Sequence, residues 1–250
     1  TNFSRARGDD TDVKVVVSDG TGTLSAADLK AVTEKTTGTV TLQNAQTVSG
    51  SGSDLVAALK TDPVTLSAAS TATITSAVTA AVAAEIAAIT DITLDSSGDG
   101  TITDTLENLL NEGQTAISTA FSNARAEDTD VNVIISDGTG SIDAAKLSLI
   151  TAKTTGTVTL QNAQTIQGTG DEVTAALITD AVTLSAASNA TVTGNVTAEV
   201  AGNIANVTDI TAAFSGTITD TLANLADSGS ISTNFSRARG DDTDVKVVVS

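Results

Sequence analysis

The sequence predicts a right-handed α/β solenoid, in which short coils of strand, turn, strand and helix stack into two parallel β-sheets and one row of helices. Three observations predict it: a long segment recurs along the chain, a Val-Thr-Leu tripeptide returns every 24 to 28 residues, and an amphipathic segment follows each expected pair of strands. A single coil of this length cannot bury its own apolar side. Equivalent strands are therefore expected to pair in parallel and share one core.

The repeats define the organisation of the chain. The segment Thr1 to Ser18 recurs letter for letter at Thr233 to Ser250, and a diverged copy begins at Phe121. We expect residues 1–12 to end a preceding repeat, residues 13–130 and 131–244 to form two repeats of four coils each, and residues 245–250 to start the next repeat. The chain contains no Met. We therefore expect an excerpt from a longer array.

The first strand of each coil is predicted by β-branched residues that alternate with polar ones, a pattern with the period of a β-strand. Longer apolar runs from Val13 and Val131 open the two repeats. The Val-Thr-Leu tripeptide or a near relative begins at Val40, Val64, Ile92, Val158, Val182 and Ile210.

The second strand of each coil is predicted by one aliphatic residue between small hydroxyl residues, after a turn-forming sequence such as SDGTG or QNAQ. The expected buried aliphatics are Leu24, Val48, Ile74, Ile102, Ile142, Ile166, Val192 and Ile218. The preceding hydroxyl residues would form a column on the outer face: Thr23, Thr47, Thr73, Thr101, Ser141, Thr165, Thr191 and Thr217. Such a ladder predicts, as an alternative function, an ice-binding or surface-binding module. Thr is, however, also a favoured strand residue.

Helices are expected after the second strands. Ser25 and Asp28 form the start of a capping box before Leu29 and Val32. Apolar residues at helical spacing form a matching stripe in the two repeats: Val78, Val82, Ile86 and Ile89, then Val196, Val200, Ile204 and Val207. The competing fold is a tandem array of all-β sandwich domains of about 115 residues. A sandwich gives no reason for a tripeptide that returns every 24 to 28 residues.

The composition excludes several function classes. The chain has 12 Lys and Arg against 30 Asp and Glu, a net charge of −18, and no Cys, His, Met, Trp or Tyr. Imidazole acid–base chemistry and zinc sites of Cys or His are therefore excluded. The acidity argues against nucleic-acid partners, and no apolar run is long enough for insertion into a membrane. A carboxylate-based polysaccharide-processing enzyme is the remaining enzymatic alternative. We expect no enzyme and no catalytic residue, because sugar sites favour aromatic platforms.

A candidate contact patch lies in the repeated end segment, which concentrates Phe and all the Arg residues: Phe3, Arg5, Arg7, Phe121, Arg125, Phe235, Arg237 and Arg239. Acidic clusters follow directly, so the segment could join one rod to another through Arg–carboxylate pairs around a Phe anchor. The structural alternative is a local salt-bridged elbow that covers the core.

The same acidic clusters are the candidate metal site, with calcium as the expected ion, because three carboxylates within four residues can chelate from a turn. Their members are Asp9, Asp10 and Asp12; Glu127, Asp128 and Asp130; and Asp241, Asp242 and Asp244. The alternative is an acidic run that is simply solvated. Candidate N-glycosylation sites, which require secretion through a glycosylating route, are Asn2, Asn189, Asn195, Asn206 and Asn234.

The texture VTLQNAQTIQGTGDEVTAALI, from Val158 to Ile178, resembles the repeats of giant, acidic, Cys-free surface and fibril proteins secreted by cyanobacteria and other aquatic bacteria. The resemblance covers nearly all of the chain and implies an extracellular, type I-secreted protein; it assigns no catalytic residue. We therefore expect a structural protein of a long extracellular fibre or cell-surface filament, which self-associates along or between rods. The alternative structural role is an adhesin stalk.

Overall fold

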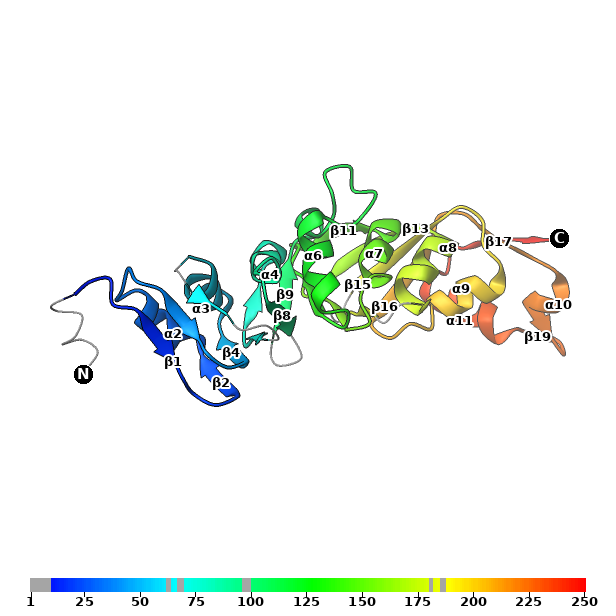
Figure 1. Ribbon diagram of the computed structural model, residues 1–250. Coiled ribbons are helices and arrows are strands. Elements are labelled where there is room, and N and C mark those ends of the chain that lie inside the picture. The colour runs from blue at the N-terminus through cyan, green and yellow to red at the C-terminus, as the bar shows by residue number, and fades with distance from the viewer. Residues whose placement is uncertain (1–9, 62–63, 67–69, 96–99, 180–181, 185–187) are drawn as a thin grey trace. The chain divides into compact units, whose positions relative to one another are not determined.

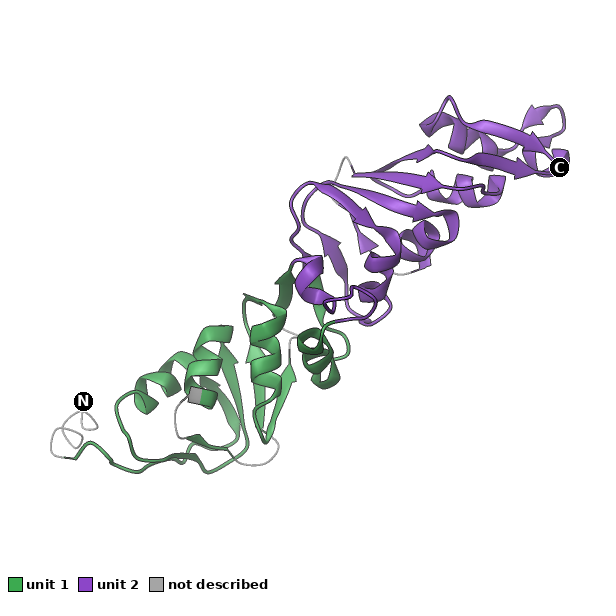
Figure 2. Cartoon of the chain, turned by 90° about the horizontal axis from the view of Figure 1, so that it is seen from above, with its two compact units in different colours: residues 1–104, 118–133 green, residues 105–117, 134–250 purple. Residues whose placement is uncertain are grey.

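The computed structural model describes residues 10–61, 64–66, 70–95, 100–179, 182–184 and 188–250, and its fold is mixed α/β with parallel sheets (Figure 1). The chain divides into two compact units (Figure 2). The first comprises Thr1–Asp104 and Ser118–Val133, and the second comprises Thr105–Ile117 and Ile134–Ser250. This division reflects how compactly the residues pack and does not test the repeat borders. The borders at residues 13, 131 and 245 remain predictions from the sequence.

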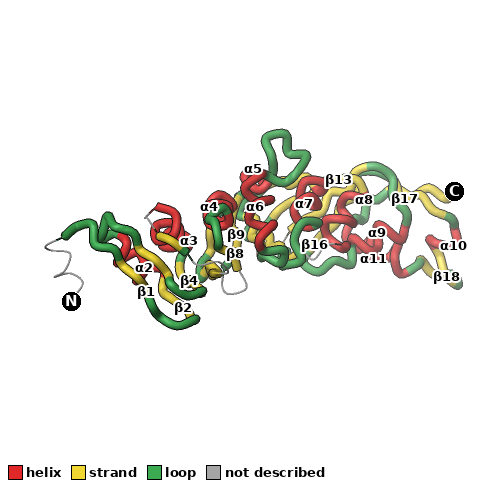
Figure 3. Tube along the Cα trace, in the orientation of Figure 1, coloured by secondary structure: helices red, strands yellow, loops and turns green. Residues whose placement is uncertain are grey.

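Groups of successive strands are separated by helices along the first unit (Figure 3). One parallel sheet contains β1 (Val15–Val17), β3 (Val40–Leu42) and β5 (Val64–Thr65), with Val15 opposite Val40 and Val40 opposite Val64. The Val-Thr-Leu tripeptides of the first coils thus pair in register. Val40 and Leu42 are buried, whereas Thr41 between them is half-buried, as the alternation predicts.

A second parallel sheet of this unit contains β2 (Gly22–Ser25), β4 (Gln46–Gly50), β6 (Ser70–Ile74) and β8 (Ile92–Asp95). Its inward row is Leu24, Val48, Ala72 and Leu94. A short strand β7 (Ala77–Val78) follows β6 but lies outside this sheet, and it pairs in parallel with β9 (Thr101–Asp104).

The pairing corrects the strand columns expected from the sequence. Ile92 lies opposite Ser70, in the sheet of the second strands, and Ile102 lies opposite Val78. The physical reason is β7: the chain forms an additional strand after β6, so the following strands are displaced by one position. The outer hydroxyl row of this sheet accordingly comprises Thr23, Thr47, Thr71 and Thr93, and does not follow the expected column through Thr73 and Thr101.

The helices of the first unit are α2 (Ala26–Thr33), α3 (Gly52–Val56) with its π-helical continuation η1 (Ala57–Thr61), α4 (Ala80–Ala87) and α6 (Thr119–Glu127). They contact one another in this order, α2 with α3, α3 with α4, and α4 with α6. Each α-helix begins after a hydroxyl residue whose oxygen accepts a backbone N–H of the first turn, and the start predicted at Ser25 is confirmed.

The second unit repeats these elements. Strand β10 (Asn132–Ile135), which begins in the first unit, shares a parallel sheet with β12 (Val158–Leu160) and β14 (Val182–Thr183). Another parallel sheet contains β11 (Gly140–Asp143), β13 (Gln164–Thr169), β15 (Ser188–Thr193) and β16 (Ile210–Phe214). The displacement seen in the first unit recurs, because Ile210 lies opposite Ser188 and Ile218 bridges to Val196.

The end of the second unit has its own small sheets. Strand β17 (Thr217–Asp220) pairs in parallel with β20 (Lys246–Val249), and β18 (Ala226–Asp227) forms an antiparallel hairpin with β19 (Ser230–Ile231). The helices are α5 (Leu106–Leu109), α7 (Ala144–Thr151), α8 (Gly170–Thr174) with η2 (Ala175–Thr179), α9 (Ala198–Ile204), α10 (Leu222–Leu225) and α11 (Thr233–Asp241). Helix α5 contacts α7, α7 contacts α8, α8 contacts α9, and α9 contacts α11.

The core is aliphatic and rich in alanine. Fully or almost fully buried side chains include Val48, Leu55, Ile86, Leu147 and Ile166, and small residues such as Ala26 and Ala144 are buried where helices begin next to the sheets. A Cβ on Gly50 would lie 2.6 Å from the Ala26 Cβ, so the strand and the helix approach more closely than larger side chains would permit.

Candidate functional site

The repeated end segment forms a helix in both places where the structure describes it. Ser118 begins α6 and its hydroxyl accepts the Phe121 N–H at 3.2 Å; Ser232 begins α11 and accepts the Phe235 N–H at 3.3 Å. Phe3, Arg5 and Arg7, from the first copy of the predicted contact patch, lie outside the described residues.

The patch residues differ in accessibility. Phe121 is fully buried, so it serves the core and is not an exposed anchor for another rod. Phe235 and Arg125 are half-buried, whereas Arg237 and Arg239 are exposed on α11. The predicted patch is therefore divided between a buried aromatic side and an exposed basic side.

The acidic clusters share one local geometry. In each copy the first Asp of an Asp-Thr-Asp sequence accepts the backbone N–H of the second: Asp12 donates to Asp10 at 3.1 Å, Asp130 to Asp128 at 3.3 Å, and Asp244 to Asp242 at 3.1 Å. This hydrogen bond closes a short Asx turn.

The two carboxylates of such a turn influence each other. A hydrogen bond with the Asp12 side chain, helped by the Asp12 backbone N–H, lowers the pKa of Asp10, and the same side-chain contact and the nearby negative charge raise the pKa of Asp12. Asp128 raises the pKa of Asp130 in the same way. Asp9 lies outside the described residues. Within the part of the chain that the structure describes, no group of three or more acidic side chains has an arrangement that could hold a metal ion.

In the second unit two of the predicted metal ligands have a structural role. Asp241 Oδ2 accepts the Ala212 N–H at 2.9 Å, and Asp242 Oδ2 accepts the Phe214 N–H at 2.8 Å. Both donors belong to β16, the last strand of its sheet. These carboxylates thus satisfy the backbone of an edge strand, which would otherwise present unpaired N–H groups. Glu127 at the end of α6 is exposed, and Asp128 is buried.

Sequence reasoning missed three other carboxylates, which connect segments 22 to 31 residues apart. Asp104 Oδ2 accepts the Ala80 N–H at 3.0 Å, and Asp220 Oδ2 accepts the Ala198 N–H at 3.0 Å, so each caps a helix that begins 22 to 24 residues earlier in the chain. Asp137 Oδ2 accepts the Leu106 N–H at 2.7 Å in the same manner. The pKa of Asp220 is lowered by the Asn224 side-chain amide and by the Ala198 and Thr221 N–H groups. The sequence feature that could have pointed to Asp104 and Asp220 is the TITDTL sequence shared by the two repeats.

The shared QNAQ sequence also connects coils. Asn44 Nδ2 donates to the Asp19 C=O at 2.6 Å and Gln46 Nε2 donates to the Gly20 C=O at 2.8 Å, so both side chains hold the turn of the preceding coil. Asn162 and Gln164 repeat these bonds to Asp137 and Gly138 at 2.7 and 2.8 Å. The identical residues thus make the same side-chain hydrogen bonds in both units.

The candidate glycosylation sites lie in different surroundings. Asn189, Asn195 and Asn206 are exposed, although the Asn195 side-chain oxygen accepts the Thr217 hydroxyl at 2.6 Å. Asn234 is half-buried on α11, where a Cβ on Gly202 of α9 would lie 2.5 Å from its Cα. Asn2 lies outside the described residues.

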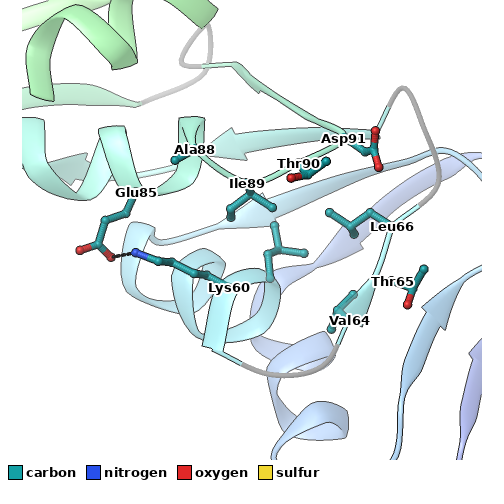
Figure 4. A pocket seen from close by; sticks show the side chains of 10 residues that line it. Lys60, Val64, Thr65, Leu66, Glu85, Ala88, Ile89, Thr90 and Asp91 are labelled. Atoms are coloured by element: carbon teal, nitrogen blue, oxygen red, sulfur yellow. Dashed lines mark ion pairs between the residues drawn. The ribbon is translucent and has the colours of Figure 1, made fainter. Parts of the chain in front are cut away.

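A surface pocket of the first unit is lined by Leu59, Val64, Leu66 and Ile89, with Lys60 and Glu85 paired at 3.3 Å at its margin (Figure 4). Both charged side chains are about half exposed and neutralise each other. The pocket is thus an aliphatic hollow between coils, with an ion pair at its margin.

The described helices do not include one that is both long enough and apolar enough to cross a membrane. No known protein family matches the chain, and no curated protein sequence matches it significantly.

Proposed function

We propose that the chain is a right-handed α/β solenoid whose stacked coils form part of a long extracellular fibre or cell-surface filament, without a catalytic role. The observation that carries the proposal is the in-register parallel pairing of equivalent strands, exemplified by the row of Val15, Val40 and Val64. A chain that extends by adding equivalent coils gains length without changing its cross-section.

The hydrogen bonds between coils support a role in which the chain resists mechanical extension. The carboxylate caps and the Gln and Asn ladders each join residues 22 to 31 positions apart, about one coil. Because backbone ladders also run between coils, extension of the rod would have to break many hydrogen bonds together. The net charge of −18 would keep neighbouring rods from collapsing onto one another.

The extracellular location rests on the resemblance of the VTLQNAQT sequence pattern to the repeats of secreted surface and fibril proteins. The absence of Cys is compatible with this location. Self-association along the rod is the partner interaction that this function requires.

Electron microscopy of the native material tests the proposal. We expect long, thin, unbranched filaments that an antibody raised against this chain decorates along their whole length. Isolated compact particles that carry the same antibody would contradict the proposal.

A further inference from the structure

The parallel sheet of β1, β3 and β5 ends at β5, in the middle of the first unit. Its register places Val40 opposite Val64, and the sequence pattern would continue this column at Ile92. Ile92 instead lies opposite Ser70 in another sheet. Among the residues that the structure describes, β5 therefore has a strand partner on one edge only.

The hydrogen bonds of the sheet determine which backbone groups face the other edge of β5. The Gln43 N–H, directly after β3, donates to the Val17 C=O at 3.0 Å, so the odd-numbered residues of this segment face β1. Backbone groups of alternate residues face opposite edges of a strand, so the even-numbered residues of β3 face β5 and bond with Thr65 in this register. The N–H and C=O groups of Val64 and Leu66 therefore face the edge that has no strand partner.

A hollow of about 420 Å³ lies along this edge (Figure 4). Three consecutive residues line it, Val64, Thr65 and Leu66, although alternate side chains of a strand point to opposite faces of the sheet. Its opposite wall includes Ile89 and Asp91, in the connection from α4 to β8. The volume is within the range of ligand sites, about 300–1,000 Å³. The displacement of β8 into another sheet thus leaves the position beside β5 open.

The hollow is aliphatic at its centre and charged at its two ends. Lys60 of η1 and Glu85 of α4 pair at 3.3 Å at one end, and the exposed Asp91 lies near Leu66 at the other (Figure 4). Among the described residues that line the hollow, Lys60 is the only cation, and Glu85 neutralises it. A basic group of a ligand is therefore favoured near Asp91.

We propose that the first unit binds an extended peptide, which adds to the free edge of β5 as a further parallel strand and has the sequence type Val-Thr-Leu followed by a basic residue. The strands β3 and β5 both have the sequence Val-Thr-Leu and pair in register, so the same tripeptide fits the next position. Its backbone bonds with Val64 and Leu66, its aliphatic side chains fill the hollow, and its basic residue meets Asp91. This binding role goes beyond the proposed filament function and does not depend on it.

An NMR titration of the isotope-labelled chain with the synthetic peptide acetyl-Val-Thr-Leu-Lys-amide tests the proposal. We expect saturable shifts of the Val64 and Leu66 amide signals. Signals of individual residues are needed because β14 also ends its sheet in the second unit, where Ile178 and Asn203 replace the ion pair of Lys60 and Glu85.

Two N-methylated peptides form a matched pair for this titration. In the proposed register the Thr N–H of the peptide points toward β5 and its Leu N–H points away, as Thr65 of β5 faces β3 and Leu66 does not. N-methylation at Thr should therefore weaken binding about tenfold, because the Val64 C=O loses its donor. N-methylation at Leu should leave most of the affinity.

The variant Asp91→Asn tests the charged end of the hollow. Asp91 has a φ of 63°, a left-handed conformation that Asn also adopts, so the variant removes the charge and keeps the backbone. It should weaken binding of the Lys peptide by about 1.5- to 5-fold and leave binding of a peptide with Gln in place of Lys unchanged.

Two outcomes would overturn the inference. The first is the absence of saturable shifts at Val64 and Leu66 up to the solubility limit of the peptide. The second is a loss of binding on methylation at Leu that equals or exceeds the loss on methylation at Thr. Neither outcome depends on whether native filaments exist, so failure of the peptide site and failure of the proposed function are distinguishable.

Discussion

The helix pairs α4–α6 and α9–α11 make the same contact in the two units with different residues. In the first unit, Ala84 of α4 and Ala120 of α6 occupy the positions that Gly202 of α9 and Asn234 of α11 occupy in the second. A Cβ on Gly202 would lie 2.5 Å from the Asn234 Cα and 2.6 Å from its Cβ. A larger residue on one helix is thus accompanied by a smaller residue on the other, and the close helix packing is kept.

The largest effect is expected from Gly202→Ala. The added methyl group would meet backbone atoms of α11, which cannot move away as a flexible side chain can, so we expect a loss of about 2–3 kcal/mol of stability. Chemical denaturation followed by circular dichroism measures it. The matched change Ala84→Gly in the first unit should cost about 1 kcal/mol, through helix propensity alone.

The comparison is sharpened by the double variant Gly202→Ala, Asn234→Ala, which recreates the Ala–Ala pair of the first unit. It should recover little of the loss, because the Asn234 atoms nearest to the added methyl group, which are Cα, Cβ and the backbone O, are also present in Ala. If Gly202→Ala were as mild as Ala84→Gly, the close approach of α9 and α11 would not limit the residue at position 202.

The next effect concerns the carboxylates that cap helices of the preceding coil. Asp104→Ala and Asp220→Ala each leave a buried N–H without its acceptor, at Ala80 and Ala198, and should lower Tm by about 4 °C. Hydrogen exchange should accelerate at the first turn of α4 in one variant and of α9 in the other. Equal acceleration of both helices by either variant would contradict a local cap.

Thr105 and Thr221 supply a matched control for this prediction. Thr105 caps α5 by accepting the Asn108 N–H at 3.3 Å, whereas Thr221 makes no capping hydrogen bond. Thr105→Ala should therefore lower Tm more than Thr221→Ala does.

A smaller, pH-dependent effect on stability is expected, because the pKa of Asp220 is lowered and that of Asp130 is raised. The pKa of Asp220 lies below the ordinary 3.8, so its stabilising contribution is present above pH 3.8 and is lost as the pH falls through the lowered pKa. The pKa of Asp130 is raised, so its protonation begins above pH 3.8 and adds stability as the pH falls. NMR titration of the carboxyl groups should place the Asp220 midpoint below 3.8 and the Asp130 midpoint above it. The reverse order would refute both assignments.

The smallest expected effect is a salt dependence of a carboxyl pKa, which α3 should show and α8 should not. In the first unit Asp54 accepts the Ser51 hydroxyl at 2.8 Å and pairs with Lys30 at 3.0 Å, and these contacts lower its pKa. In the second unit Thr169 and Glu172 form a complete capping box, and Ser148 replaces Lys30. About 1 M NaCl should raise the pKa of Asp54 slightly, because salt screens the exposed pair. The variant Lys30→Ser should remove this salt dependence; its persistence would exclude the ion pair as the cause.

The strands and the helix starts could be predicted from the sequence, because alternation and hydroxyl caps are local signals. Val40 and Leu42 were expected to be buried around Thr41, and they are. The displaced register of Ile92 and Ile102 could not be predicted, since β7 has two residues and shows no periodicity.

The candidate sites were less predictable, since they depend on contacts between coils. Phe121 was interpreted either as the anchor of a contact between rods or as part of an elbow that covers the core, and its side chain and that of Ala124 form the buried face of α6. Asp104 caps a helix 24 positions earlier in the chain, a distance at which no local pattern connects donor and acceptor. The shared TITDTL sequence marked the position of this carboxylate without revealing its partner.

The carboxylate caps have a consequence for synthesis of the chain on the ribosome. Asp104 accepts a backbone N–H from the first turn of α4, and Asp220 accepts one from the first turn of α9. The first turn of each helix therefore depends on a residue that is translated after the helix itself. During synthesis each of these helices would therefore be completed only after a further 22 to 24 residues have been translated. Until then, the first turn of the most recently emerged helix would lack the carboxylate that accepts its backbone N–H.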